Sequence, residues 1–124
     1  MKLKKIIFIT LLLICYNTVH AAITITASEI IAYPVPFNPN QKTLTIGEKA
    51  GGSDLSGYSV NVSVYDINGD LIIEKSGSGN IKWNGRNKSG RIVKPGLYIL
   101  KVEIEEYGNP SNYIKKIIRI LIDY

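Results

Sequence analysis

Beyond residue 21, the chain consists mostly of short runs in which apolar and polar side chains alternate. In the clearest run, at residues 58–64, the apolar residues are Tyr58, Val60, Val62 and Val64. Similar runs occupy residues 23–26, 43–46, 97–106 and 112–123. A period of two places successive side chains on opposite faces of a strand, so these runs predict half-buried β-strands. No helical period appears after residue 21.

Turn signals separate the predicted strands. Asn68-Gly69 predicts a two-residue type I′ hairpin between strands at 60–67 and 70–76, and glycines at 77 and 79 end the second of these. Pro95-Gly96 predicts a type II turn before the strand at 97–106. Short strands at this spacing predict an all-β fold, an antiparallel β-sandwich of about seven strands.

Trp83 is the only tryptophan and lies at strand spacing from Ile81, so both side chains share one face. Asn84-Gly85 then ends the strand, and Gly90 permits a second reversal. A Trp provides a large apolar area but needs a partner for its N–H. We therefore predict that Trp83 is buried between the two sheets.

Residues 33–39 contain three prolines and cannot form a helix. This segment is predicted to be an extended edge or crossing segment with Phe37 as its buried anchor. The cations of the last run, Lys115, Lys116 and Arg119, are predicted to be solvated.

The N-terminal residues have the pattern of an export signal. Three lysines precede an apolar run at residues 6–16, and Val19-His20-Ala21 places small residues at the positions that a signal peptidase reads. This predicts a signal peptide at 1–21 and one domain at 22–124. An uncleaved anchor and a lipid anchor at Cys15 are the alternatives.

Cleavage after residue 21 changes the composition. The single Cys and the single His leave with the signal, as do three of the 15 Lys and Arg residues, so 12 cations remain against 10 Asp and Glu. A net charge of +2 does not predict a nucleic-acid partner. The processed chain is not expected to be an integral membrane protein, and its stability must come from one apolar core.

Three segments carry a resemblance to a known family: Tyr33–Pro39, Val64–Gly69 and Trp83–Tyr98. They resemble the motifs of FlgD-type Ig-like domains, which are related to the C-terminal sorting domains of type IX secretion. The matching positions are Pro36, Phe37, Asn38, Pro39, Asp66, Gly69, Trp83, Gly85, Gly90, Gly96 and Tyr98. The resemblance implies an Ig-like sandwich that is exported and acts in envelope or surface assembly, attachment or secretion. The implied partner is another envelope or secreted protein.

Residues 66–70 match the opening of a calcium loop, with Asp66, Asn68 and Asp70 as weak candidate ligands. The match then fails, because Leu71 takes the place of the loop glycine and Gly77 that of the closing Glu. A hairpin turn is favoured, and no cofactor is expected. Glu103 and Glu105 share a strand face and could do acid–base work, but carboxylates on an outward face usually serve solvation and edge protection. No Ser can be assigned as a nucleophile because no His remains as its base, so we do not expect an enzyme.

Exposed tyrosines suggest a second hypothesis. Tyr65, Tyr107 and Tyr113 are predicted to lie at the surface, and Tyr offers rigid contact area with a polar tip. The chain would then be a small extracytoplasmic binding module that recognises a glycan or a peptide.

Overall fold

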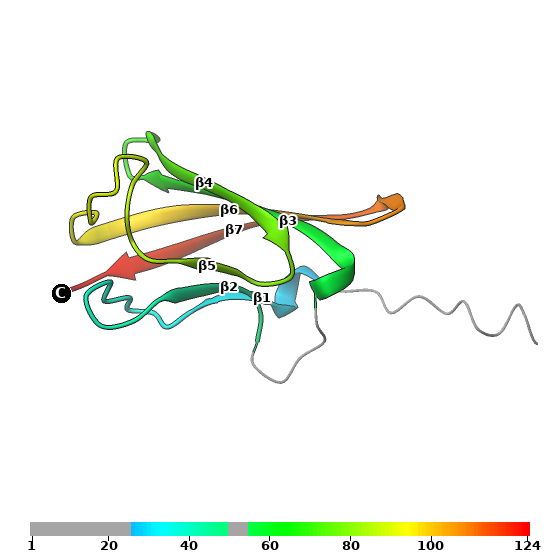
Figure 1. The fold of residues 1–124 in the computed structure, drawn as a ribbon, viewed down its shortest axis with the longest axis horizontal. Coiled ribbons are helices and arrows are strands. Elements are labelled where there is room, and N and C mark those ends of the chain that lie inside the picture. The colour runs from blue at the N-terminus through cyan, green and yellow to red at the C-terminus, as the bar shows by residue number, and fades with distance from the viewer. Residues whose placement is uncertain (1–25, 50–54) are drawn as a thin grey trace, which may run out of the picture.

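Two antiparallel sheets face each other in the computed structural model, which describes residues 26–49 and 55–124 (Figure 1). The three-stranded sheet has the order β1 (Ile30–Tyr33), β2 (Leu44–Glu48) and β5 (Ile81–Trp83). The four-stranded sheet has the order β4 (Leu71–Ser78), β3 (Tyr58–Asp66), β6 (Gly96–Glu106) and β7 (Asn109–Ile122). Two short 3-10 turns, η1 (Ala27–Glu29) and η2 (Leu55–Gly57), complete the elements. The predicted all-β sandwich of seven strands is confirmed.

Several predictions concern residues outside this range. The signal peptide at 1–21, its cleavage site and Cys15 lie outside the described residues, as does nearly all of the strand predicted at 23–26. They stay predictions. Within the described part of the chain, no helix has the length and apolar character needed to cross a membrane.

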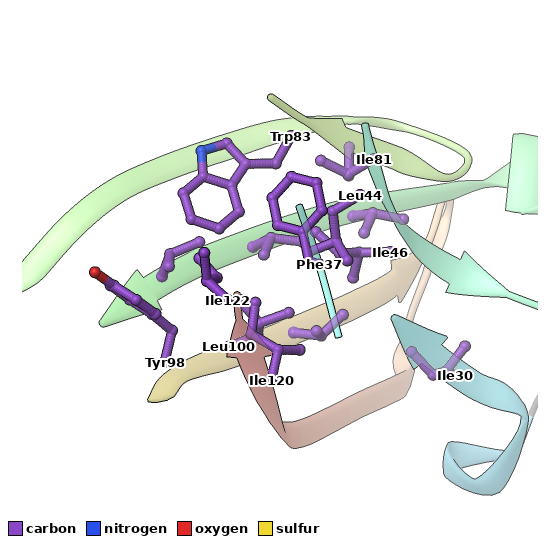
Figure 2. Packing of buried hydrophobic residues seen from close by; sticks show 14 of the residues in the cluster. Ile30, Phe37, Leu44, Ile46, Ile81, Trp83, Tyr98, Leu100, Ile120 and Ile122 are labelled. Atoms are coloured by element: carbon purple, nitrogen blue, oxygen red, sulfur yellow. The ribbon is translucent and has the colours of Figure 1, made fainter. Parts of the chain in front are cut away.

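The core lies between the sheets and is formed by the apolar positions of the alternating runs. On β3 and β6, Val62 pairs with Val102 and Val60 with Ile104, and all four side chains are buried. Burying a side chain of this size stabilises the fold by about 1.5–3 kcal/mol. Figure 2 shows how the three-stranded sheet and residue 37 close over this layer; the labelled residues are Ile30, Phe37, Leu44, Ile46, Ile81, Trp83, Tyr98, Leu100, Ile120 and Ile122.

Lysines protect both edges of the four-stranded sheet. Lys75 on β4 and Lys116 on β7 occupy the core-facing row that contains Val62 and Val102. Both are half-buried, and the Lys116 ammonium donates a hydrogen bond to the Ile30 carbonyl oxygen of β1. A charge directed inward from an edge strand disfavours pairing with another strand. The prediction that Lys116 is simply solvated is therefore wrong.

The β3–β4 connection is not the predicted two-residue type I′ turn. That turn needs positive φ at both central residues, and no described non-glycine residue has one; Gly69 alone has φ 85° here. The Gly69 N–H donates to the Asp66 carbonyl, and the Asp66 N–H to the Asp70 carbonyl. This is a three-residue loop with a type I turn followed by a glycine bulge. The Asp66 side chain, which accepts two backbone N–H groups, favours it.

Other boundaries also differ from prediction. The type II turn at Pro95-Gly96 is absent: Gly96 has φ 147°, far from the value of about +80° that such a turn needs. Strand β6 already begins at Gly96 because that residue pairs with Ile122. Strand β4 runs through Gly77 to Ser78, and β7 begins three positions earlier than predicted, at Asn109. Pairing with β3 overrides the weak local preference of glycine in β4, and the pairing of Asn109 with Glu106 begins β7 before Pro110.

Candidate functional site

The three motif segments converge at one end of the sandwich, which we call the loop end (Figure 1). It consists of residues 34–43, 66–70, 84–95 and 120–124. The Phe37 N–H donates to the Leu121 carbonyl at 2.8 Å, and the Asp123 N–H donates to the Phe37 carbonyl at 3.1 Å. The proline-rich segment is thus attached to the end of β7, which lies far away in the sequence.

Phe37 and Trp83 form the aromatic centre beneath the loop end. Both are fully buried, and their ring centroids lie 5.9 Å apart with the planes tilted by 43° (Figure 2). The Trp83 indole N–H donates to the Arg86 carbonyl at 2.9 Å, so the polar atom of this large side chain has a partner. The pair therefore links the proline-rich segment to β5 by packing.

Gly85 allows the backbone to approach this aromatic pair closely. Its φ is 75°, and a Cβ atom added there would lie 2.5 Å from the Pro39 Cβ and 3.2 Å from a ring carbon of Phe37. The Gly85 carbonyl also accepts a hydrogen bond from the Val93 N–H at 2.9 Å. Both the conformation and the contact require glycine here.

Two loops of the same design lie side by side at the loop end. In each, an Asp or Asn side chain accepts the N–H groups two and four positions later, and a glycine with φ near 80° lies three positions later. The first begins at Asp66 and the second at Asn87. The Lys88 N–H donates to the Ile72 carbonyl, which joins the second loop to β4. The sequence signal is the spacing Asx-x-x-Gly, which our sequence analysis missed in the second loop.

Tyrosine hydroxyls hold the last part of the loop end against the sheet. The Tyr98 hydroxyl donates to the Lys94 carbonyl at 2.7 Å, and the Tyr124 hydroxyl donates to the Val93 carbonyl at 2.8 Å. Burial, together with the negative charge of Asp66, raises the pKa of the Tyr98 hydroxyl above its ordinary value. A tyrosine near a strand start that bonds a carbonyl just upstream also occurs as the tyrosine corner of Ig-like domains.

A cavity of about 350 Å³ opens between the two loops. Its charged lining residues are Asp66, Arg91 and Lys94, and its apolar walls come from Ile72, Ile92 and Val93. The lining offers one carboxylate and two cations but no nucleophile beside a base. It could hold a polar group of a partner, and it does not resemble a reaction centre.

The candidate calcium ligands are joined by hydrogen bonds within the turn. One carboxylate oxygen of Asp66 accepts the Asn68 N–H at 2.9 Å and the Asp70 N–H at 3.0 Å. Across residues 26–49 and 55–124, no three His, Cys, Asp or Glu side chains are grouped so that they could hold a metal ion. The geometry supports a capped turn at this place.

A ligand stabilises a fold only by binding the folded state, and the Asp66 carboxylate here caps the turn. We therefore expect calcium to leave the melting temperature unchanged. Asp66→Ala should lower the free energy of unfolding by about 1 kcal/mol through loss of two exposed hydrogen bonds. Asp70→Ala is the matched control and should have a smaller effect. Thermal melts in millimolar calcium and in chelator measure both. A melting temperature several degrees higher in calcium, abolished by Asp66→Ala, would contradict the turn.

The three tyrosines of the binding hypothesis do not form one cluster. Tyr65 is half-buried and pairs with Ile99, whereas Tyr113 pairs with Glu105, so about 20 Å of strand separates them. Tyr107 is 60% exposed, at the turn between β6 and β7. A binding role for these residues stays a prediction.

A polar network surrounds Glu103, one of the two carboxylates considered for catalysis. The Tyr113 hydroxyl donates to one Glu103 oxygen at 2.9 Å, and the Lys101 ammonium lies 3.3 Å from the other. These two hydrogen bonds, that of Tyr113 first, hold the pKa of the Glu103 carboxyl below its ordinary value. A lowered pKa suits an ion pair, whereas a catalytic acid needs a raised one.

Comparison with known proteins identifies one family and two similar structures. Residues 32–120 match the family model described as "Secretion system C-terminal sorting domain". PorZ of Porphyromonas gingivalis, described as an essential bacterial surface component of the type IX secretion system, has 28% identity and a TM-score of 0.52. Dimeric latent PorU of the same organism has 22% identity and a TM-score of 0.51, a likeness of fold.

These alignments cover 79% and 75% of this chain but only 12% and 9% of PorZ and PorU. The chain therefore corresponds to a small part of each of these longer proteins. A comparison with curated protein sequences finds no significant match.

Proposed function

The chain belongs to the family of secretion system C-terminal sorting domains, and from this membership we propose that it is a folded address for type IX secretion. In this proposal the domain directs the protein that carries it to the cell surface. The family match over residues 32–120 is the observation that carries the proposal. Sorting domains of this family are non-catalytic modules that components of the secretion system recognise.

The geometry suits a signal that is read in its folded state. Four separate segments are assembled at the loop end by hydrogen bonds to carbonyls and by the buried Phe37–Trp83 pair. An unfolded chain would not present these segments together. We expect residues 1–21 to bring the chain across the inner membrane first, so that the domain folds before the type IX system transports it.

A reporter inserted between residues 21 and 22 of the full chain tests the proposal. A fluorescent protein that folds in the periplasm should reach the cell surface or the medium of a bacterium that has a type IX system. It should stay in the periplasm of a strain without the translocon. Surface labelling and fractionation measure the distribution.

The matched control keeps residues 1–21 and the reporter but omits residues 26–124. It should stay in the periplasm in both strains. If the reporter on the full chain also stayed there in the strain with a working system, the proposed function would be wrong.

A further inference from the structure

The outer face of the four-stranded sheet is divided into a polar half and an apolar half. The polar half contains Ser59, Asn61 and Ser63 of β3, with Lys101, Glu103, Glu105 and Lys115 beside them. The other half lies toward the loop end and carries large apolar side chains, although it faces away from the core. We call this set the outer apolar patch: Tyr65, Leu71, Leu97, Ile99, Ile117 and Leu121.

The strand register makes this patch continuous across all four strands. One row runs from Leu71 through Tyr65 and Ile99 to Arg119. In the next row, Leu97 pairs with Leu121. The Cβ atoms of directly opposed residues on a sheet lie about 4.5–5.5 Å apart, so the members of each row are adjacent on this face. Leu97 and Ile117 are 57% and 54% exposed, which is high for apolar residues in strands.

Arg119 is the one cation within the patch. Its neighbours are Ile99 across the sheet and Ile117 and Leu121 along its own face of β7. It is exposed, and it makes no ion pair or hydrogen bond with any described residue. Glu103 of β6, four positions from the Arg119 partner Ile99, is occupied by Lys101 and Tyr113, and Asp123 lies four positions along the chain, beyond Leu121. An arginine surrounded by apolar residues is typical of the central part of a protein interface.

We propose that the outer apolar patch docks the secretion component that receives the domain, and that the partner surface is apolar with a carboxylate placed to pair with Arg119. This proposal rests on the proposed function and names the chemistry of the partner. A carboxylate is required because Arg119 would otherwise be buried in the interface without a counter-charge.

Two other occupants fit the patch less well. In a second copy packed patch to patch, the patch itself contains no acid for Arg119, and Asp123 lies only at its margin, beyond Leu121. An anionic membrane is held by clusters of cations, and here one cation lies among apolar residues.

The reporter assay with the full chain tests the docking surface. Arg119→Glu should reduce surface delivery at least about tenfold, as expected for a charge reversal at an interface hot spot. Leu97→Ser should also reduce delivery, since it removes apolar contact area. Lys115→Glu is the matched control: it reverses an exposed charge on the same strand and face, in the polar half, and should stay within about twofold of the parent. Thermal melts of the purified variants should match the parent, because all three residues are exposed.

The outcomes separate this inference from the proposed function. If the parent chain is not delivered, both are wrong. If the parent, Arg119→Glu and Leu97→Ser are delivered equally, the inference alone is wrong. It is also wrong if the parent sediments as a dimer that Arg119→Glu dissociates, or if the parent binds phosphatidylserine vesicles and Arg119→Glu does not. If Arg119→Glu melts at a lower temperature than the parent, the surface delivery of Leu97→Ser decides the test. Full delivery of Leu97→Ser would overturn the inference.

Discussion

Replacing Trp83 with alanine is expected to lower the free energy of unfolding by about 3–5 kcal/mol, the usual cost of truncating a buried aromatic side chain. Trp83 is fully buried and packs against Phe37 between the two sheets (Figure 2). The substitution leaves a cavity there and removes the hydrogen bond to the Arg86 carbonyl. A domain of this size has a total stability of about 5–10 kcal/mol, so the variant should be barely folded.

Denaturant unfolding of the parent and the variant measures the effect. Lys82→Ala is the matched control, since Lys82 is the preceding residue of the same strand and is exposed. It should change the stability by no more than about 0.5 kcal/mol. A loss below about 1 kcal/mol for Trp83→Ala would show that the indole is not part of the core and would return it to the candidates for binding.

Gly85→Ala is expected to cost about 2–5 kcal/mol, the sum of a strained backbone and a steric conflict. The backbone term arises because Gly85 has φ 75°, where a Cβ atom is unfavourable. The steric term arises because that Cβ would lie 2.5 Å from the Pro39 Cβ, so residues 37–39 would have to move. The variant should therefore separate the proline-rich segment from the 84–95 loop.

Gly69→Ala provides the matched control for this prediction. Gly69 has nearly the same φ, 85°, but an added Cβ would meet nothing within 4 Å. It should therefore cost only the backbone term, about 1–2 kcal/mol. Urea midpoints of the two variants give the comparison. Equal losses would mean that the contact with Pro39 is relieved by a small shift and that packing at the loop end is loose.

The strands and their buried faces could be predicted because that information is local. A period of two assigns each side chain to one face of its strand. In β3, Val60, Val62 and Val64 form the apolar face that is buried. The same reasoning placed Trp83 in the core from its spacing to Ile81, and Phe37 was predicted as the buried anchor of the proline-rich segment; both are buried. The turn types were less predictable, because several conformations of Asn-Gly and Pro-Gly have similar energies. At residues 66–70 the hydrogen bonds of the Asp66 side chain decided between them.

The sequence by itself determined the all-β class, the faces of the strands and the glycine at the end of β5. The tertiary structure alone decided which distant residues these elements contact. Gly85 was identifiable as a turn residue, but its contact with Pro39 depends on how a distant segment crosses the core. Likewise, Leu71, Tyr65, Ile99 and Arg119 form one row only because the strand order is β4-β3-β6-β7. The pairing of β3 with β6 joins segments that are distant in the sequence, so burial over the whole domain decides it and no local turn signal records it.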